Sequence, residues 1–247
     1  PQNLKNNTEE YEFLKKMEAD LAIVVAYGQI IPKEYLSLTK KGFINIHASI
    51  LPKWRGAAPI QRAIMNLDTE TGISIMKINE ELDSGPVSNT YKIKLDQSLN
   101  AKEVSEKLAL IAADKILDVV DEIFEGKSNF VDQDNSKATY AKKITKNEGQ
   151  IDWKSDALKI IGKINGLYPF PGAFFNFNGQ RYKILKAEIG NGIGKNGEVI
   201  SDDLEIACGG EKSIKVFEIQ REGKKAQKIG EFMLGSQIRK GSIISNV

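Results

Sequence analysis

Histidine and cysteine are nearly absent from this sequence of 247 residues, which contains one of each. The single cysteine, Cys208, excludes an internal disulfide and is typical of proteins from a reducing compartment. Structural zinc sites need several Cys or His side chains, so we predict no bound metal. Ser49 lies close to the only histidine, His47, and has no second histidine to activate it. We therefore do not expect a nucleophilic triad.

Long hydrophobic runs are also missing. The longest apolar segment, residues 21–27, is far shorter than the roughly 20 residues that span a bilayer. The opening residues 1–5 show no cationic head followed by an apolar stretch, as a signal peptide would. We therefore expect a cytoplasmic protein with no membrane partner.

Charge is nearly balanced over the whole chain, at +2, but is divided unevenly. Residues 1–130 hold 16 basic and 19 acidic side chains, a net charge of −3, whereas residues 131–247 hold 19 and 14, a net charge of +5. A basic second half is what a nucleic-acid-binding module would show. An ordinary lysine-rich surface would look the same, so charge alone leaves both readings open.

The first 130 residues alternate between helical and extended patterns. Apolar periodicity predicts helices up to Asp20, from Pro59 to about Asn66, and over Ala101–Phe124. The expected strands are Leu21–Ala26, Gly42–Ile46, Gly72–Ile78 and Val87–Leu95. The continuous apolar run of the first strand is typical of a parallel sheet. We predict an α/β domain over residues 1–130 with a mostly parallel sheet.

Periodicity is lost over residues 125–150, of which we predict 131–150 to be a linker, and the pattern then changes. A helix over Ser155–Asn165 is followed by short expected strands at Ala173–Phe177, Arg181–Lys186, Gly197–Ile200, Leu204–Ala207 and Ile214–Gln220. Short strands separated by Gly and Asn turns indicate a small β-barrel or sandwich over residues 151–247, and an OB-like barrel is one option.

The residues best suited to chemistry are Asn45, His47 and Asp83. Asn45 and His47 lie two apart at the end of one predicted strand, so their side chains leave on the same side. Asp83 follows the strand Gly72–Ile78, and its carboxylate could orient the imidazole in a solvent-reached crevice. The Asn45 carboxamide could donate to an oxyanion, which fits metal-free acyl transfer. A capping Asn, a structural His and an Asx turn at Asp83 are also compatible with the spacing.

Two longer segments, Asn45–Gly56 and Gly72–Pro86, resemble the signatures of folate-dependent formyltransferases. The resemblance implies a Rossmann-like catalytic domain in which Asn45, His47 and Asp83 are catalytic. It also implies that 10-formyltetrahydrofolate, the formyl donor, lies against two loops. The residues implied in donor binding are Gln29, Ile30, Ile31, Ser49, Leu51, Pro52, Asn79, Glu80, Glu81 and Leu82.

Three further segments resemble the branch of this family that acts on initiator methionyl-tRNA. They are Arg55–Gln61, Ile151–Trp153 with Tyr168–Gly172, and Gly223–Ala226. The resemblance implies formylation of the methionyl α-amino group for translation initiation, and tRNA phosphates held by basic side chains. The candidate tRNA contacts are Arg55, Gln61, Lys142, Lys143, Lys146, Lys224, Lys225, Arg239 and Lys240.

Members of the formyltransferase family that this sequence resembles begin with a strand, a Gly-Thr-Pro turn and a basic loop. These elements have no counterpart in this sequence. We therefore expect an N-terminally incomplete sheet, with an unpaired edge and an exposed apolar face at Leu21–Ala26. Two alternatives stay open: a formyltransferase acting on an amino-sugar nucleotide, and a truncated homologue that binds tRNA without catalysis. We expect a monomer.

Overall fold

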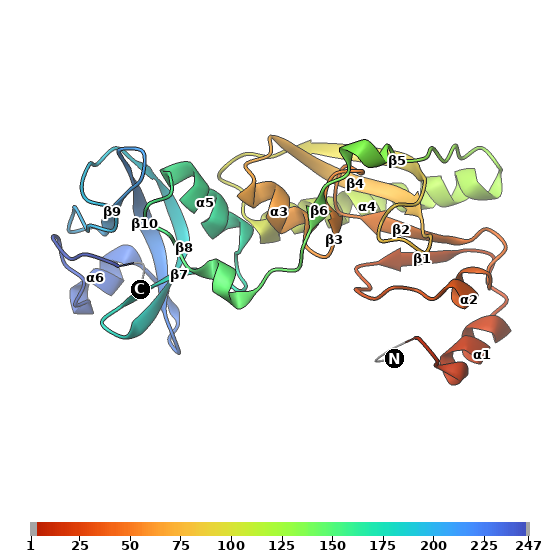
Figure 1. Cartoon of the computed structure of the whole chain (residues 1–247), viewed down its shortest axis with the longest axis horizontal. Helices are drawn as coiled ribbons and strands as arrows, with labels where there is room; N and C mark the ends of the chain where they lie inside the picture. Colours follow the sequence, from red (N-terminus) through yellow and green to blue (C-terminus); the bar gives the residue numbers. More distant parts are fainter. Residues whose placement is uncertain (1–3, 246–247) are drawn as a thin grey trace. The chain divides into compact units, whose positions relative to one another are not determined.

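The computed structural model describes residues 4–245 and contains two compact units (Figure 1). Unit 1 comprises the chain up to Pro59 together with Glu70–Lys94 and Ser105–Lys143. Unit 2 comprises Ile60–Thr69, Leu95–Val104 and the chain from Ile144 onward. Within the described range, no helix is both long and apolar enough to cross a membrane.

Unit 1 is built on a four-stranded sheet in the order β1-β2-β4-β5. These strands are β1 (Ala22–Val25), β2 (Phe43–His47), β4 (Glu70–Lys77) and β5 (Val87–Lys94). Only the β1–β2 pair is parallel, and the β2–β4 and β4–β5 pairs are antiparallel. The prediction of a mostly parallel sheet is therefore wrong. The β4–β5 connection is a short loop, which suits an antiparallel pair, whereas a parallel pair needs a long crossover.

Alternation along β2 decides which side chains face the core. Ile44 points to one face, where it packs with Ile75 of β4 and with Val119 and Ile123 of α4 (Ala101–Phe124). Phe43 points to the other face, where it packs with Tyr35 of α2 (Lys33–Leu36). Because side chains alternate along a strand, Asn45 and His47 share the face of Phe43, opposite α4.

The N-terminal helix α1 (Thr8–Lys16) packs beside α2 on that face. It begins at Asn7, whose side chain accepts a 3.2 Å hydrogen bond from the Glu10 amide. The Tyr35 hydroxyl donates to the Asn7 carbonyl at 2.8 Å, which ties the start of α1 to α2. Glutamates in the first turn and lysines in the last complement the helix dipole.

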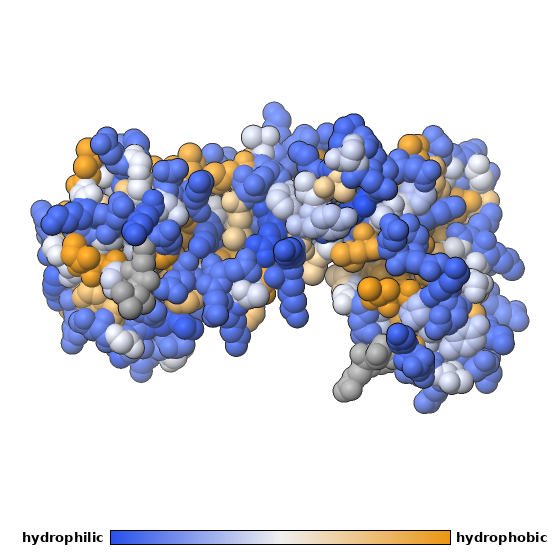
Figure 2. Space-filling view, in the orientation of Figure 1, coloured by the Kyte–Doolittle hydropathy of each residue, from blue (hydrophilic) through white to orange (hydrophobic). Residues whose placement is uncertain are grey.

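Strand β1 lies at the edge of this sheet, as expected. Its Ala22 and Val24 pack against the cluster around Tyr35, whereas Ile23 and Val25 on its opposite face are exposed. Figure 2 shows hydrophobic surface over this part of unit 1. Within residues 4–245 no strand pairs with the outer edge of β1, and its exposed apolar side chains agree with the expectation.

Residues 131–143 are part of unit 1 and not a free linker. Val131 forms a bridge with Val87, and β6 (Tyr140–Ala141) pairs in parallel with β3 (Arg55–Gly56). Between them lies the short 3-10 helix η1 (Asn135–Lys137), capped by Asp134. The predicted linker over residues 131–150 is therefore wrong for residues 131–143, which pair through their backbone with β3 and Val87 in spite of their polar composition.

Unit 2 contains a five-stranded antiparallel sheet in the order β11-β10-β8-β7, with β9 also paired to β10. The strands are β7 (Ala173–Phe177), β8 (Gln180–Gly190), β9 (Glu205–Cys208), β10 (Lys212–Arg221) and β11 (Ala226–Lys228). Among the described residues no pairing closes this sheet, so an OB-like closed barrel is not observed. The expected strand Gly197–Ile200 makes only isolated bridges.

Helix α5 (Ala157–Gly166), 3-10 helix η2 (Lys146–Gly149) and helix α6 (Ile229–Gly235) complete unit 2. The core is aromatic at its centre, where the Phe175 and Tyr182 rings stack with centroids 5.5 Å apart. Trp153 meets Phe175 edge-on at 5.9 Å. The Ile151–Trp153 motif therefore supplies packing in this unit.

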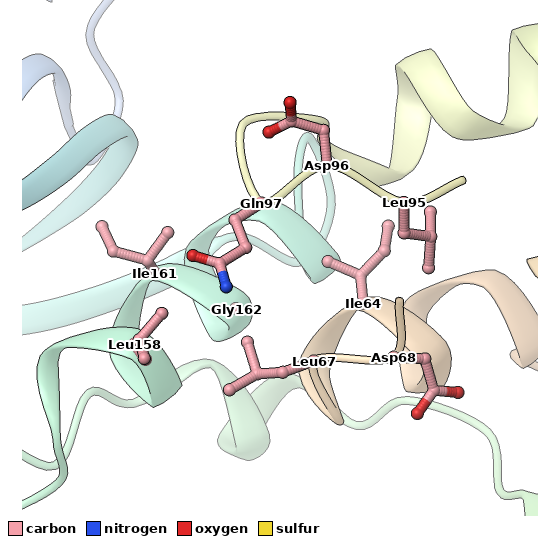
Figure 3. Close-up of a pocket in the computed structure, with 9 residues that line it drawn as sticks. All are labelled: Ile64, Leu67, Asp68, Leu95, Asp96, Gln97, Leu158, Ile161 and Gly162. Carbon is pink, nitrogen blue, oxygen red and sulfur yellow. The ribbon is translucent and has the colours of Figure 1, made fainter. Parts of the chain in front are cut away.

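Unit 2 also includes helix α3 (Pro59–Met65) from Ile60 onward and the loop before α4 from Leu95 onward. The predicted domain limits assigned both segments to the first domain. Gly162 of α5 lies so close to α3 that an added Cβ would be 2.8 Å from Leu67. Figure 3 shows Ile64, Leu67, Leu158 and Ile161 converging there. The cavity between them measures about 20 Å³, room for about one water, so this is a packing contact.

Candidate active site

Asn45 and His47 occupy the end of β2, on the face that α4 does not cover. Asn45 is half-buried, and its carboxamide forms no hydrogen bond to any other described residue. His47 is only 6% exposed, so the expectation of a histidine open to solvent is wrong. One strand end thus holds an uncommitted amide beside a buried imidazole.

Both nitrogens of His47 face oxygen atoms. Nε2 lies 2.9 Å from the Trp54 carbonyl oxygen. Since a carbonyl can only accept, Nε2 carries a hydrogen. Nδ1 lies 3.6 Å from Asp83 Oδ2, which is close enough for an ion pair and too long for a hydrogen bond. Because Asp83 lies too far away for a hydrogen bond, an Nδ1–H would remain available to a further acceptor.

Asp83 is held by backbone geometry as well as by hydrogen bonds. It adopts a positive φ of 47°, a conformation in which Asp and Asn are enriched. Its Oδ2 accepts a 2.8 Å hydrogen bond from the Gly56 amide. Gly85 follows closely, and a Cβ at that position would collide with the Lys77 carbonyl oxygen. The carboxylate beside His47 therefore has a defined direction.

The two loops predicted to bind the donor are brought together by an ion pair. Lys33 Nζ, after the first loop, lies 2.6 Å from Glu80 Oε1 in the second. Ile30 and Leu82 expose 71% and 52% of their surface and offer apolar contacts to a flat ring system. Asn79, Glu81 and Ser84 bond within their own turn.

Besides His47, four residues predicted to bind the donor or tRNA are buried. Ile31 packs in the cluster around Tyr35, and Leu51 is buried in the turn after β2. The Ser49 hydroxyl donates to the Lys53 carbonyl at 2.6 Å and has no exposed surface. Arg55, predicted to contact tRNA, is 3% exposed and donates to Gln133 and Asn135. Their burial leaves these side chains little or no surface for the donor or tRNA to contact.

The remaining predicted residues lie at accessible or partly accessible positions. Pro52 and Gln61 are half-buried, Pro52 in the turn after β2 and Gln61 in α3. The predicted basic contacts other than Arg55 are exposed, and they are Lys142, Lys143, Lys146, Lys224, Lys225, Arg239 and Lys240. The first two lie in unit 1 and the other five in unit 2.

Comparison with known families identifies the family to which this chain belongs. The formyl transferase model matches residues 2–120, and the formyl transferase C-terminal domain model matches residues 143–237. The chain is 66% identical over its whole length to the methionyl-tRNA formyltransferase of Pelagibacter ubique, of which it covers 80%. The chain belongs to the methionyl-tRNA formyltransferase family. The predicted family and enzyme class are thereby confirmed.

Other methionyl-tRNA formyltransferases match nearly as completely. Those of Chelativorans sp. and Caldanaerobacter subterraneus are each 40% identical over 98% and 99% of this chain, which covers 78% and 80% of their lengths. Residues 121–142, which carry β6 and η1, fall between the two matched family models.

Solved structures support the fold. HypX from Aquifex aeolicus in complex with tetrahydrofolic acid superposes with a TM-score of 0.70 at 19% identity, over 92% of this chain and 40% of HypX. The sugar 3N-formyl transferase WlaRD superposes with a TM-score of 0.68 at 20% identity, over 86% of this chain and 77% of WlaRD. At these identities the likeness concerns the fold alone.

Three groups at this methionyl-tRNA formyltransferase site were not predicted: the Trp54 carbonyl, the Gly56 amide and the Gln133 side chain. The first two act through the backbone, which leaves little trace in a sequence. Gln133 lies in a polar stretch without periodicity, so no signal separated it from its neighbours.

Proposed function

We propose that this protein transfers the formyl group of 10-formyltetrahydrofolate to the α-amino group of methionine on initiator methionyl-tRNA. The donor supplies the activated formyl carbon, and the methionyl amine attacks it. The observation that carries the proposal is the arrangement of Asn45, His47 and Asp83 in a chain so similar to methionyl-tRNA formyltransferases.

In this proposal Asn45 and His47 stabilise the negative charge that develops on the formyl oxygen. The Asn45 carboxamide has its N–H groups uncommitted, and the protonated His47 donates from Nδ1 while Nε2 stays anchored on the Trp54 carbonyl. Donors fixed before the reaction need no reorganisation, and each is worth about 2.7–4 kcal/mol in comparable oxyanion sites. Both act from the same face of β2.

Asp83 has two roles in the proposal. At 3.6 Å its carboxylate stabilises the positive charge on the imidazole without sequestering the Nδ1–H in a short hydrogen bond. It also takes part, directly or through water, in passing a proton from the attacking amine toward the departing folate nitrogen.

The donor would lie against the loop after β1 and the loop after β4. The Lys33–Glu80 ion pair joins these loops, and Ile30 and Leu82 present apolar surface. Gln29, Pro52, Asn79, Glu80 and Glu81 are the other contacts that we propose. A pterin ring packs well on exposed aliphatic side chains, so these residues fit the group.

The tRNA would be held through its phosphates by exposed basic side chains of both units. The proposed contacts are the half-buried, uncharged Gln61 and the exposed basic residues Lys142, Lys143, Lys146, Lys224, Lys225, Arg239 and Lys240. Such contacts release counterions, so affinity should fall steeply with salt.

The function is tested by incubating the protein with 10-formyltetrahydrofolate and either initiator methionyl-tRNA or an amino-sugar nucleotide. N-formylmethionyl-tRNA is quantified after acid gel separation, and the formylated sugar by mass spectrometry. We expect formylation of the tRNA only. Formylation of the sugar alone would contradict the proposed acceptor, and salt-dependent tRNA binding without any transfer would contradict the proposed catalysis.

A further inference from the structure

The side chain of Gln133 connects the buried Arg55 to the loop that carries Asp83. Its Nε2 donates to the Asp83 carbonyl at 2.9 Å and to the Gly85 carbonyl at 2.7 Å. Its Oε1 accepts from Arg55 Nε at 3.0 Å and from an Arg55 terminal nitrogen at 2.8 Å. All hydrogen-bonding capacity of this one amide is spent on two segments of the site.

Arg55 is itself fixed from several directions. The same terminal nitrogen donates to Asn135 Oδ1 at 2.8 Å, and the Arg55 amide donates to the Thr139 carbonyl at 2.8 Å. On either side of Arg55 lie Trp54, whose carbonyl accepts from His47, and Gly56, whose amide donates to Asp83. A buried guanidinium is tolerated only where its donors are satisfied, so Gln133 is needed for this turn to keep its shape.

The positions of His47 and Asp83 therefore depend on one short turn and one loop, and Gln133 bonds to both. The Trp54–Gly56 turn contacts the imidazole and the carboxylate, and Gln133 holds the backbone of Asp83 against that turn. We propose that Gln133 is a positioning residue that sets the distance between His47 and Asp83 for formyl transfer.

The effect of Gln133 on catalysis rests on the proposed function. Its effect on the positions of His47 and Asp83 rests on geometry alone. Asp83 has a positive φ, a strained conformation that persists only when its surroundings hold it. Two hydrogen bonds from Gln133 to the carbonyls of Asp83 and Gly85 supply that support. A shift of about 1 Å in a reacting group can lower turnover about 100-fold.

The informative variant is Gln133→Glu. A carboxylate still accepts from Arg55 but cannot donate, and it repels the carbonyls of Asp83 and Gly85. Gln133→Met, of similar length and without polar atoms, is measured alongside it in case the carboxylate prevents folding. Asp132→Ala is the control, because this neighbouring side chain is exposed and lies outside the network.

His47 is the only histidine of the chain, so protein labelled with ¹⁵N-histidine and freed of any tag gives a single pair of imidazole nitrogen signals. We expect both Gln133 variants to move these signals in the direction seen in Asp83→Asn, and Asp132→Ala to leave them unmoved. Imidazole signals of wild-type position in a folded Gln133 variant would overturn the positioning role, whether or not the protein transfers formyl groups.

Steady-state kinetics then tests the catalytic consequence. We expect Gln133→Glu to lower kcat about 10-fold to 100-fold while KM for donor and tRNA changes by no more than about threefold. Equal changes in kcat and KM, or a kcat like that of Asp132→Ala, would overturn the catalytic role. Because the imidazole signals need no substrate, a failure of the proposed function is distinguished from a failure of this inference.

Discussion

The amide of Gly56 donates a 2.8 Å hydrogen bond to Oδ2 of Asp83, the same oxygen that faces Nδ1 of His47. Gly56 has a φ of 119°, and a Cβ added to it would lie 2.9 Å from the Ala141 carbonyl oxygen. The glycine is required both by its backbone conformation and by its closeness to β6. The contact that directs the Asp83 carboxylate therefore depends on a residue without a side chain.

Gly56→Ala should lower both stability and turnover. Strain at a positive φ costs about 1–3 kcal/mol, and displacement of the Gly56 amide should lower kcat. Gly126→Ala is the matched control, because Gly126 also has a positive φ of 72° but has open space around it. Thermal unfolding should show losses in both variants, and formylation assays a loss of kcat in Gly56→Ala only. Equal kcat in the two variants would contradict the role of the turn.

Asn45→Ala separates catalysis from stability most cleanly. We expect kcat to fall about 100-fold to 1,000-fold, as when one oxyanion donor is removed. The melting temperature should change little, because the carboxamide has no hydrogen bond to lose within the described range. Assays at saturating donor and tRNA together with thermal unfolding check this. A large drop in melting temperature with normal kcat would mean that Asn45 is structural.

The pH dependence of stability should reveal the Arg62–Glu148 pair of unit 2. Arg62 donates to Glu148 at 2.6 Å, and this hydrogen bond, followed by that from the Thr145 amide, lowers the pKa of Glu148 from 4.5 to about 2. A depressed folded-state pKa gives stability that is present above pH 4.5 and is lost as the pH falls toward 2. Glu148→Gln should therefore melt below wild type at neutral pH, and the gap should narrow below pH 4.5.

Glu188→Gln is the control for that comparison, because Glu188 is an exposed carboxylate of the same unit. It should melt like wild type across the range. A gap for Glu148→Gln that is unchanged between pH 7 and pH 3 would show that the ion pair does not contribute through its charge.

Salt dependence tests the proposed tRNA contacts. Lys224→Glu should weaken tRNA binding and reduce the slope of log K against log salt by about one for a lost phosphate contact. Lys107→Glu makes the same change of charge at an exposed position of α4 and should leave the slope unchanged. Filter binding between low and moderate salt measures both slopes. Equal slopes in the two variants would contradict a specific contact at Lys224.

Hydrophobic periodicity was a good guide to the main helices and strands. The helix predicted over Ala101–Phe124 has those limits in the structure, and most predicted strands lie within a few residues of observed ones. Pairing was predicted less well. A continuous apolar strand suggests burial on both faces, but it does not distinguish a parallel neighbour from an antiparallel one.

The residues of the site were also predicted only in part. Asn45, His47 and Asp83 were predicted from strand ends and from family resemblance, and the structure brings His47 and Asp83 together. Arg55 was predicted to contact tRNA from family resemblance, yet here it is buried, and its Nε and one terminal nitrogen donate to Gln133 and Asn135 inside unit 1. Residues 131–150 were predicted to be a linker because they are polar and lack periodicity, and the backbone pairing within residues 131–143 leaves no signal in composition.

The central claim is that His47 and Asp83 act as one unit in formyl transfer. A double-mutant cycle with His47→Asn, Asp83→Asn and the double variant tests it, using single-turnover rates at saturating donor and methionyl-tRNA. Circular dichroism must first show that each variant is folded, because His47 is buried. We predict that each single change slows transfer at least about 100-fold and that the double variant is no slower than the slower single one. Losses that multiply in the double variant, or rates within a few-fold of wild type, would contradict the account.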